Sequence, residues 1–141
     1  MVKRFFSPNG LWQNEGLGLI RILVGLFMIY HGKEIFQQAT MKEYSKWLTD
    51  LHFPLPAFMA YLGKGVELVS GICLTIGLLT RLATIPLMIT MTIICFGMGH
   101  GKIFSDDQHP FLFVLLGLVF FFYGPGKWNF DEVLFSSRKV Q

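Results

Sequence analysis

The sequence is short of charge. Only 15% of its 141 residues are Asp, Glu, Lys or Arg, whereas 52% are hydrophobic and 16% are aromatic. Soluble domains carry about 25% charged residues, because a hydrated surface needs them. The composition therefore excludes an ordinary soluble domain and favours a single domain embedded in a membrane.

Several chemical motifs are missing as well. The basic residues occur at most in pairs, Lys3-Arg4 and Arg138-Lys139, so no basic cluster points to nucleic acid. Cys73 and Cys95 lie in apolar stretches and form no Cys-x-x-Cys motif. The sequence has no glycine-rich phosphate loop, nucleotide fingerprint or serine nucleophile elbow. We expect no nucleic-acid partner and no metal site, and the residues leave open whether the chain is an enzyme.

What the sequence does have is four long apolar segments, at approximately residues 16–35, 55–79, 82–99 and 110–126. A helix needs roughly 20 apolar residues to cross a bilayer, and buried backbone groups must find partners within the helix. The pattern predicts an all-α fold in which residues 1–141 form one transmembrane domain, an integral membrane four-helix bundle. Only Thr80-Arg81 separates the second and third segments, which predicts a tight antiparallel hairpin.

Positive charge is distributed unevenly between the two expected sides of the membrane. An even number of spans places both termini on one side, and basic residues are more numerous on cytoplasmic loops. The side with the termini holds Lys3, Arg4, Arg81, Lys127, Arg138 and Lys139, and the other side holds Lys33, Lys42, Lys46 and Lys102. We therefore expect both termini to be cytoplasmic.

The segment between the first two spans has helical periodicity. Met41, Tyr44, Leu48 and Leu51 recur at helical spacing, and charged residues occupy the other faces. This predicts a short interfacial amphipathic helix. It is either an ordinary connector or a lid over a binding site.

Small and soft residues mark the expected contacts between helices. Gly18, Gly25 and Gly32 repeat every seven residues, and such stripes let helices approach closely in lipid. In the third span the residues Thr84, Met88, Met91, Cys95 and Met98 form a heptad seam. Sulfur ligands suit copper(I), but methionine also fills gaps in cores, so we favour packing and expect no copper site.

Ionisable residues inside the apolar segments are the strongest functional signal, because each costs about 2.5–3.5 kcal/mol to insert. Glu67 lies near the middle of the second span, and Lys64 is three residues earlier on the same face. One interpretation is a structural ion pair, Arg21–Glu67 or Lys64–Glu67, with Arg81 in a structural or electrostatic role. The other is that Glu67 handles protons at a cavity the size of a quinone or substrate.

Two histidines complete this expected binding site. His31 and His100 lie near span ends, so His31, Lys64, Glu67 and His100 are predicted to converge beneath the amphipathic helix. Histidines from two helices are a known way to hold haem. The spacing here matches no haem motif, so we expect hydrogen-bonding histidines and no haem. His109 and Asp106-Asp107 lie in the loop before the fourth span, where we expect them to be solvated.

Three parts of the sequence together resemble the DoxX family. They are Glu67-x-x-x-Gly71-x-x-Leu74-x-x-Gly77-Leu78-x-Thr80-Arg81-x-Ala83, the first span with Leu19-Ile20-Arg21, Gly25 and His31-Gly32, and the ending Gly124-Pro125-Gly126-x-x-x-x-Asp131-x-x-Leu134. Lys64 departs from the family pattern, and so does Asn129, which stands where the family often has Ser. We expect Asn129 to be the N-cap of a short terminal helix that starts near Phe130.

The resemblance implies a small four-helix protein of the bacterial inner (cytoplasmic) membrane. The family's namesake is similar to a subunit of a thiosulfate:quinone oxidoreductase, and other members are linked to thiol and oxidative-stress systems. This implies an accessory component of membrane redox metabolism, acting on quinones, thiols or sulfur compounds, with quinone as the candidate cofactor. The alternative is a non-catalytic structural subunit. Expected partners are the lipid bilayer and either other membrane proteins or further copies of this chain.

Overall fold

The computed structural model describes residues 10–136, so Lys3, Arg4, Arg138 and Lys139 lie outside the described residues. Residues 10–136 contain helices and no strand, which confirms the all-α class. In chain order the elements are α2 (Gln13–Gly32), η1 (Lys33–Phe36), α3 (Gln38–Asp50), α4 (Pro56–Ile76), α5 (Thr80–Ile93), η2 (Ile94–Met98), α6 (Gln108–Tyr123) and α7 (Phe130–Phe135).

Local sequence explains where α4 begins and ends. Pro56 occupies its first turn, where a missing backbone N–H costs nothing. Gly77 ends it with a φ of 71°, a left-handed conformation that glycine adopts without strain. Three residues then lead directly into α5, which packs against α4.

The seven-residue glycine spacing of α2 produces its contact with α4. A Cβ atom added to Gly25 would lie 2.6 Å from the Thr75 backbone nitrogen, and one on Gly32 would overlap the backbone of Leu68. Gly18 makes the same kind of approach to the backbone of Lys127 in the C-terminal loop. These contacts place the C-terminal end of α2 beside the middle of α4.

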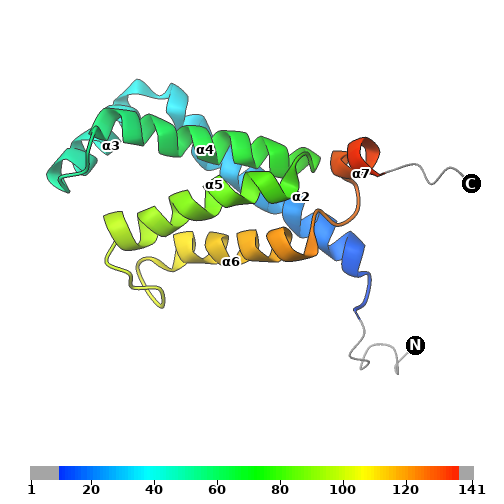
Figure 1. Cartoon of the computed structure of the whole chain (residues 1–141). Helices are drawn as coiled ribbons and strands as arrows, with labels where there is room; N and C mark the ends of the chain where they lie inside the picture. The colour runs from blue at the N-terminus through cyan, green and yellow to red at the C-terminus, as the bar shows by residue number, and fades with distance from the viewer. Residues whose placement is uncertain (1–9, 137–141) are drawn as a thin grey trace, which may run out of the picture.

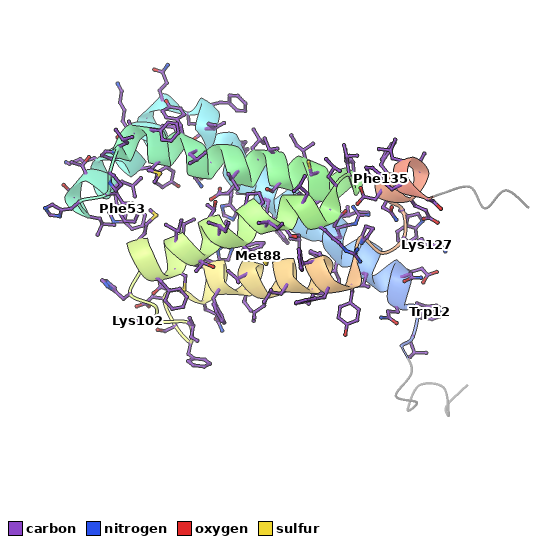
Figure 2. The ribbon with its side chains drawn as sticks, in the orientation of Figure 1. Trp12, Phe53, Met88, Lys102, Lys127 and Phe135 are labelled. Atoms are coloured by element: carbon purple, nitrogen blue, oxygen red, sulfur yellow. The ribbon has the colours of Figure 1, made fainter. Side chains whose placement is uncertain are left out.

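A second contact joins α5 to α6. Met88, labelled in Figure 2, fills the space over Gly117, where an added Cβ would lie 2.5 Å from its Cγ. The predicted seam of α5 is buried at Thr84, Met91 and Cys95. The main apolar core lies between these helices and consists of Val24, Met28, Leu74, Leu87, Met91, Phe113 and Phe120.

The molecule has two unlike ends. At one end α2 begins beside the C-terminal loop and α7, and at the other α3 packs along α4 (Figure 1). Met41 and Leu48 are the buried residues of α3, and Lys42, Glu43, Lys46 and Asp50 are exposed. α3 is therefore amphipathic, as its periodicity predicted.

Within the described part of the chain, two helical stretches are long and apolar enough to cross a membrane by length and composition, namely α4 and the continuous run of α5 and η2, Thr80–Met98. α6 is apolar but shorter, at 16 residues. Large apolar side chains are exposed on all of the long helices, for example Phe27, Val69, Ile89 and Phe122. These exposed faces suit an apolar solvent.

Candidate functional site

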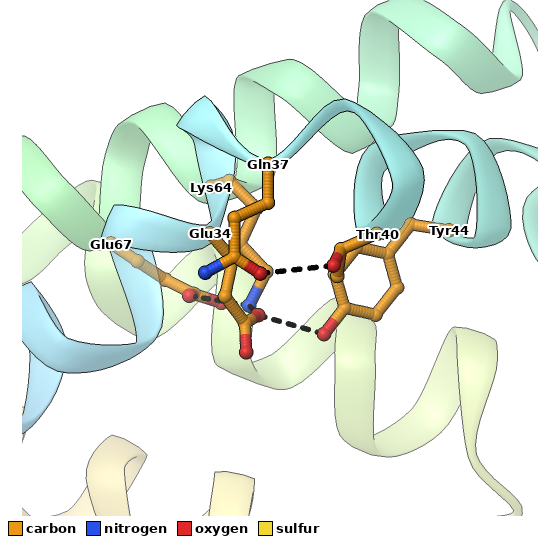
Figure 3. Close-up of polar contacts among 6 residues, drawn as sticks. All are labelled: Glu34, Gln37, Thr40, Tyr44, Lys64 and Glu67. Carbon is orange, nitrogen blue, oxygen red and sulfur yellow. Dashed lines mark hydrogen bonds and ion pairs between the residues drawn. The ribbon is translucent and has the colours of Figure 1, made fainter.

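The polar residues next to the α3 end form one cluster. α2 ends at Gly32 and continues as the 3-10 helix η1, which places Glu34 above α4 (Figure 3). α4 contributes Lys64 and Glu67, one turn apart on the same face. α3 contributes Tyr44 from the side opposite to α2.

Lys64 bridges two carboxylates in this cluster. Its Nζ lies 2.9 Å from Glu67 Oε2 and 3.0 Å from Glu34 Oε2. The Glu67 side chain is 4% exposed, and those of Lys64 and Glu34 are 13% and 25% exposed. The Tyr44 hydroxyl donates a hydrogen bond to Glu34 Oε2 at 2.8 Å, and its ring centroid lies 4.9 Å from Lys64 Nζ. Of the partners considered for Glu67, the structure places Lys64 beside it.

Glu34 and Tyr44, the outer members of the cluster, have pKa values shifted from their ordinary values. Partial burial raises the pKa of Glu34, but hydrogen bonds from Lys64 and Tyr44 outweigh it, so the net pKa lies below the ordinary value of 4.5. Burial, followed by its hydrogen bond to Glu34, raises the pKa of Tyr44 above 10.0. Glu34 is therefore a carboxylate and Tyr44 a neutral phenol at physiological pH.

A cavity of about 320 Å³ lies next to this cluster. Lys64 and Glu67 form part of its wall, together with His31, Tyr44, Thr90 and His109. The rest of the lining is almost entirely apolar and comes from α2, α3, α4, α5 and η2, including Met28, Trp47, Leu48, Phe53, Met91, Ile94 and Met98. This volume falls at the lower end of the range for small-molecule sites, which are mostly apolar with a few polar groups.

The structure brings together three of the four expected binding residues. His31, Lys64 and Glu67 line the cavity, but His100 does not: it is exposed in the loop after η2. His109, which the sequence placed in a solvated loop, takes its place in the wall. The His31 and His109 rings pack edge to face with centroids 5.4 Å apart.

The Asp107 side chain explains why His109, and not His100, lines the cavity. Its Oδ2 accepts hydrogen bonds from the backbone N–H groups of His100 and Lys102, at 2.9 and 2.8 Å. These bonds lower the pKa of Asp107 and fold the loop back on itself, with Lys102 the larger contributor. α6 consequently starts at Gln108, and His109 reaches α2 while His100 stays outside.

Arg21 lies elsewhere and does not pair with Glu67. Its buried guanidinium donates to backbone carbonyls: Nε to Pro125 at 2.7 Å, Nη2 to Trp128 at 2.8 Å and Lys127 at 3.2 Å, and Nη1 to Leu74 and to Thr75. An arginine has five N–H donors, which matches these five bonds. The expected Arg21–Glu67 pair is replaced by a clamp that fastens the C-terminal loop and the end of α4 to α2.

The neighbouring family-like residues complete this clamp. Asp131 accepts hydrogen bonds from the backbone N–H groups of Leu79 and Thr80, at 2.5 and 2.9 Å, and so caps α5. Asn129 Oδ1 accepts from Glu132 N at 2.6 Å, which confirms the predicted N-cap of α7. Arg81 is exposed and forms no ion pair with a described residue. Several residues that carry the resemblance therefore hold the end of the fold opposite to the cavity, whereas two others, His31 and Glu67, line the cavity.

Sequence reasoning missed Glu34 and His109, and treated Tyr44 only as part of an apolar stripe. The available signal for Glu34 was its position, because it is an acidic residue at the end of the first apolar segment, close to His31. Among residues 10–136 no group of three or more His, Cys, Asp or Glu side chains is arranged to hold a metal ion.

Comparisons with known proteins agree on the family. Residues 16–100 match the family model for DoxX. The chain is 32% identical over 135 residues to an uncharacterized membrane protein of Mycobacterium tuberculosis (strain ATCC 25618 / H37Rv), covering 82% of this chain and 78% of that protein. No solved structure matches the chain. With its two membrane-length apolar helices, this chain is a membrane protein that belongs to the DoxX family.

Proposed function

We propose that this protein binds a lipid-soluble molecule of the quinol–quinone class in the cavity, as an accessory component of membrane redox metabolism. The observation that carries the proposal is the Glu34–Lys64–Glu67 cluster against an otherwise apolar cavity. A buried charge cluster is expensive in a membrane protein and commonly marks function. The cavity offers room for one ring-sized head group.

The charge of the cluster selects the kind of head group. Two carboxylates and one ammonium leave a net charge of about −1, which disfavours an anionic head such as a fatty-acid carboxylate. Glu67 Oε1 accepts no hydrogen bond from the described residues, although Oε2 holds Lys64. A neutral head with hydroxyl donors, as in a quinol, suits this free acceptor, and Lys64 and His31 are the donors available to a quinone oxygen.

A bound quinol would be oxidised to a quinone and would release two electrons and two protons. Glu67 and His31 are the groups at the cavity that can take up these protons. The electrons pass to a separate membrane redox protein, which makes this chain a partner in a larger assembly. If the cavity binds no such molecule, the cluster is a structural ion pair and the protein is a structural subunit.

Tryptophan fluorescence tests the proposal. Trp47 lines the cavity, whereas Trp12 (Figure 2) and Trp128, whose carbonyl binds Arg21, lie at the opposite end. Replacing those two with Phe leaves one local reporter. We expect a short-chain benzoquinone to quench Trp47 saturably. Glu67→Gln should weaken the binding about tenfold, because a hydrogen bond to a charged group contributes roughly 1.5–3 kcal/mol.

The matched control is Glu15→Gln, which removes a carboxylate whose pair with Lys127 is exposed and lies at the opposite end of the molecule. It should leave the quenching curve unchanged. Quenching that never saturates, or that falls equally in both variants, contradicts the proposal.

We further propose that α2, α4, the α5–η2 run and α6 all cross the bacterial inner membrane as a four-helix bundle with both termini in the cytoplasm. The burial of Arg21 leaves the outer surface of α2 apolar, and Trp12 before α2 and Phe135 at the end of α7 both lie at the Lys127 end (Figure 2). Labelling of single cysteines tests this in a background without Cys73 and Cys95. Lys46→Cys should react with an impermeant maleimide in intact cells and Glu132→Cys only in broken cells; the reverse pattern contradicts the orientation.

A further inference from the structure

The cavity adjoins a second space on the outer surface of the molecule. A shallow groove between α2 and α6 is lined by Leu26, Phe27, Tyr30, His31 and His109. The two histidines also line the cavity. The groove and the cavity are thus adjoining spaces with the His31–His109 ring pair between them.

The boundary between the groove and the cavity is held by few contacts. α2 packs mainly on α4 and α6 mainly on α5, so the seam between α2 and α6 has little contact of its own. The histidine rings meet edge to face, and no described residue hydrogen-bonds to either imidazole. Aromatic side chains of this kind change rotamer without unfolding the helices that carry them.

The α3 side of the cavity is closed more firmly. α3 covers it with Tyr44, Trp47 and Leu48, and Tyr44 is fastened to Glu34 by its hydroxyl. A second apolar cluster, centred on Met41, Leu48 and Ala60, holds α3 on α4. A ligand that came from water on this side would have to displace packed side chains and an ion cluster.

The outer surface of the groove is apolar. Leu26, Phe27 and Tyr30 are 50%, 58% and 60% exposed. Lys33 Nζ lies 3.9 Å from the Tyr30 ring centroid. This lysine marks the polar edge of the apolar surface that Leu26, Phe27 and Tyr30 form. A hydrocarbon tail lying in the groove stays in surroundings like those of lipid, so only the head group has to leave the bilayer.

From this geometry we propose that the cavity takes its ligand sideways from the lipid, between α2 and α6, with the His31–His109 pair as the gate. The inference rests on the proposed function and narrows the ligand to a neutral-headed molecule with a long apolar tail that remains in the groove. A small water-borne solute does not fit this route.

The test blocks the groove after folding. In the Trp47-only reporter, with Cys73 and Cys95 replaced by Ala, Leu26→Cys is labelled with a bulky membrane-permeant maleimide. Leu23→Cys is the matched control, because Leu23 is 47% exposed on the same helix but lines neither space. A long-tailed quinone is then delivered in phosphatidylcholine vesicles, and the rate of Trp47 quenching is recorded.

Labelling at Leu26→Cys should slow the quenching about tenfold, the effect of a modestly raised barrier, and labelling at Leu23→Cys should leave the rate unchanged. His109→Ala should speed it, because the gate loses one ring. Equal rates in labelled Leu26→Cys and Leu23→Cys overturn the lateral route while saturable binding still supports the proposed function. Absence of saturable quenching in every variant overturns both.

Discussion

Lys64 is the residue on which the ion cluster depends. Removing one member of a buried ion pair leaves an uncompensated charge, which costs about 3–5 kcal/mol. We therefore expect Lys64→Met to lower the thermal unfolding temperature of the detergent-solubilised protein strongly. Lys127→Met is the matched control and should cost no more than about 1 kcal/mol, since its pair with Glu15 is exposed.

Adding Glu34→Gln and Glu67→Gln to Lys64→Met removes the repulsion that the single variant leaves behind. The triple variant should recover much of the lost stability. If Lys64→Met and Lys127→Met unfold at the same temperature, Lys64 does not hold the carboxylates together.

Glu34 predicts a pH dependence with a definite sign. Because its pKa is lower in the folded protein than the ordinary 4.5, its contribution to stability is complete above that value and disappears as the pH falls through the lower folded pKa. Wild type should therefore be more stable than Glu34→Gln by a constant amount well above the ordinary pKa of 4.5, and the difference should shrink as the pH falls through the lower folded pKa. Unfolding midpoints measured across this range check it, and a difference that grows on acidification contradicts it.

The contact between α2 and α4 depends on two helices approaching through glycine. A Cβ at Gly25 meets backbone atoms that cannot move aside, so Gly25→Ala should destabilise the fold by about 1–3 kcal/mol. Gly16→Ala is the matched control on the same helix, since nothing lies within 4 Å of its added Cβ. That substitution should be neutral or stabilising, because alanine favours helix. Equal melting temperatures for the two variants would show that α2 does not pack on α4 in this way.

The C-terminal loop and α7 depend on the Arg21 clamp. Arg21→Met removes the donors for five backbone carbonyl contacts and should release this segment, leaving the α3 end intact. Limited proteolysis should then cut between α6 and α7, where wild type resists. Arg81→Met, which alters an exposed residue without an ion pair to a described partner, should keep the wild-type pattern.

Local sequence patterns predicted much of the fold. Contacts between residues far apart in the sequence did not follow from them. The spacing of Gly25 and Gly32 predicted close helix contact, and Asn129 predicted a cap, because both signals are local. The partners of Arg21 are backbone carbonyls between 53 and 107 residues away, such as that of Trp128, and carbonyls carry no residue-specific signal. His109 is exposed, as expected, but its place in the cavity wall did not follow from the sequence, because it depends on the fold that Asp107 gives to the loop.

At the scale of the whole molecule, the two ends of the protein carry different features. The Arg21 and Asp131 contacts near α7 fix the fold, and the cavity between α3 and the ends of α2 and α5 holds the reactive groups. Family-like residues occur at both ends, with Arg21 and Asp131 at the former and His31 and Glu67 at the cavity. Membership of the DoxX family therefore accounts for the architecture, and the ligand that we propose depends on the cavity residues, above all on Lys64 and its two carboxylates.

The quinone content of protein purified from its native membrane decides between a ligand site and a structural ion pair. We predict about one quinone for each chain in wild type and in Glu15→Gln, and a several-fold lower content in Glu67→Gln, since a charge-assisted hydrogen bond is lost there. No quinone in wild type, or the same content in Glu67→Gln as in Glu15→Gln, would contradict the proposal that this cavity binds one.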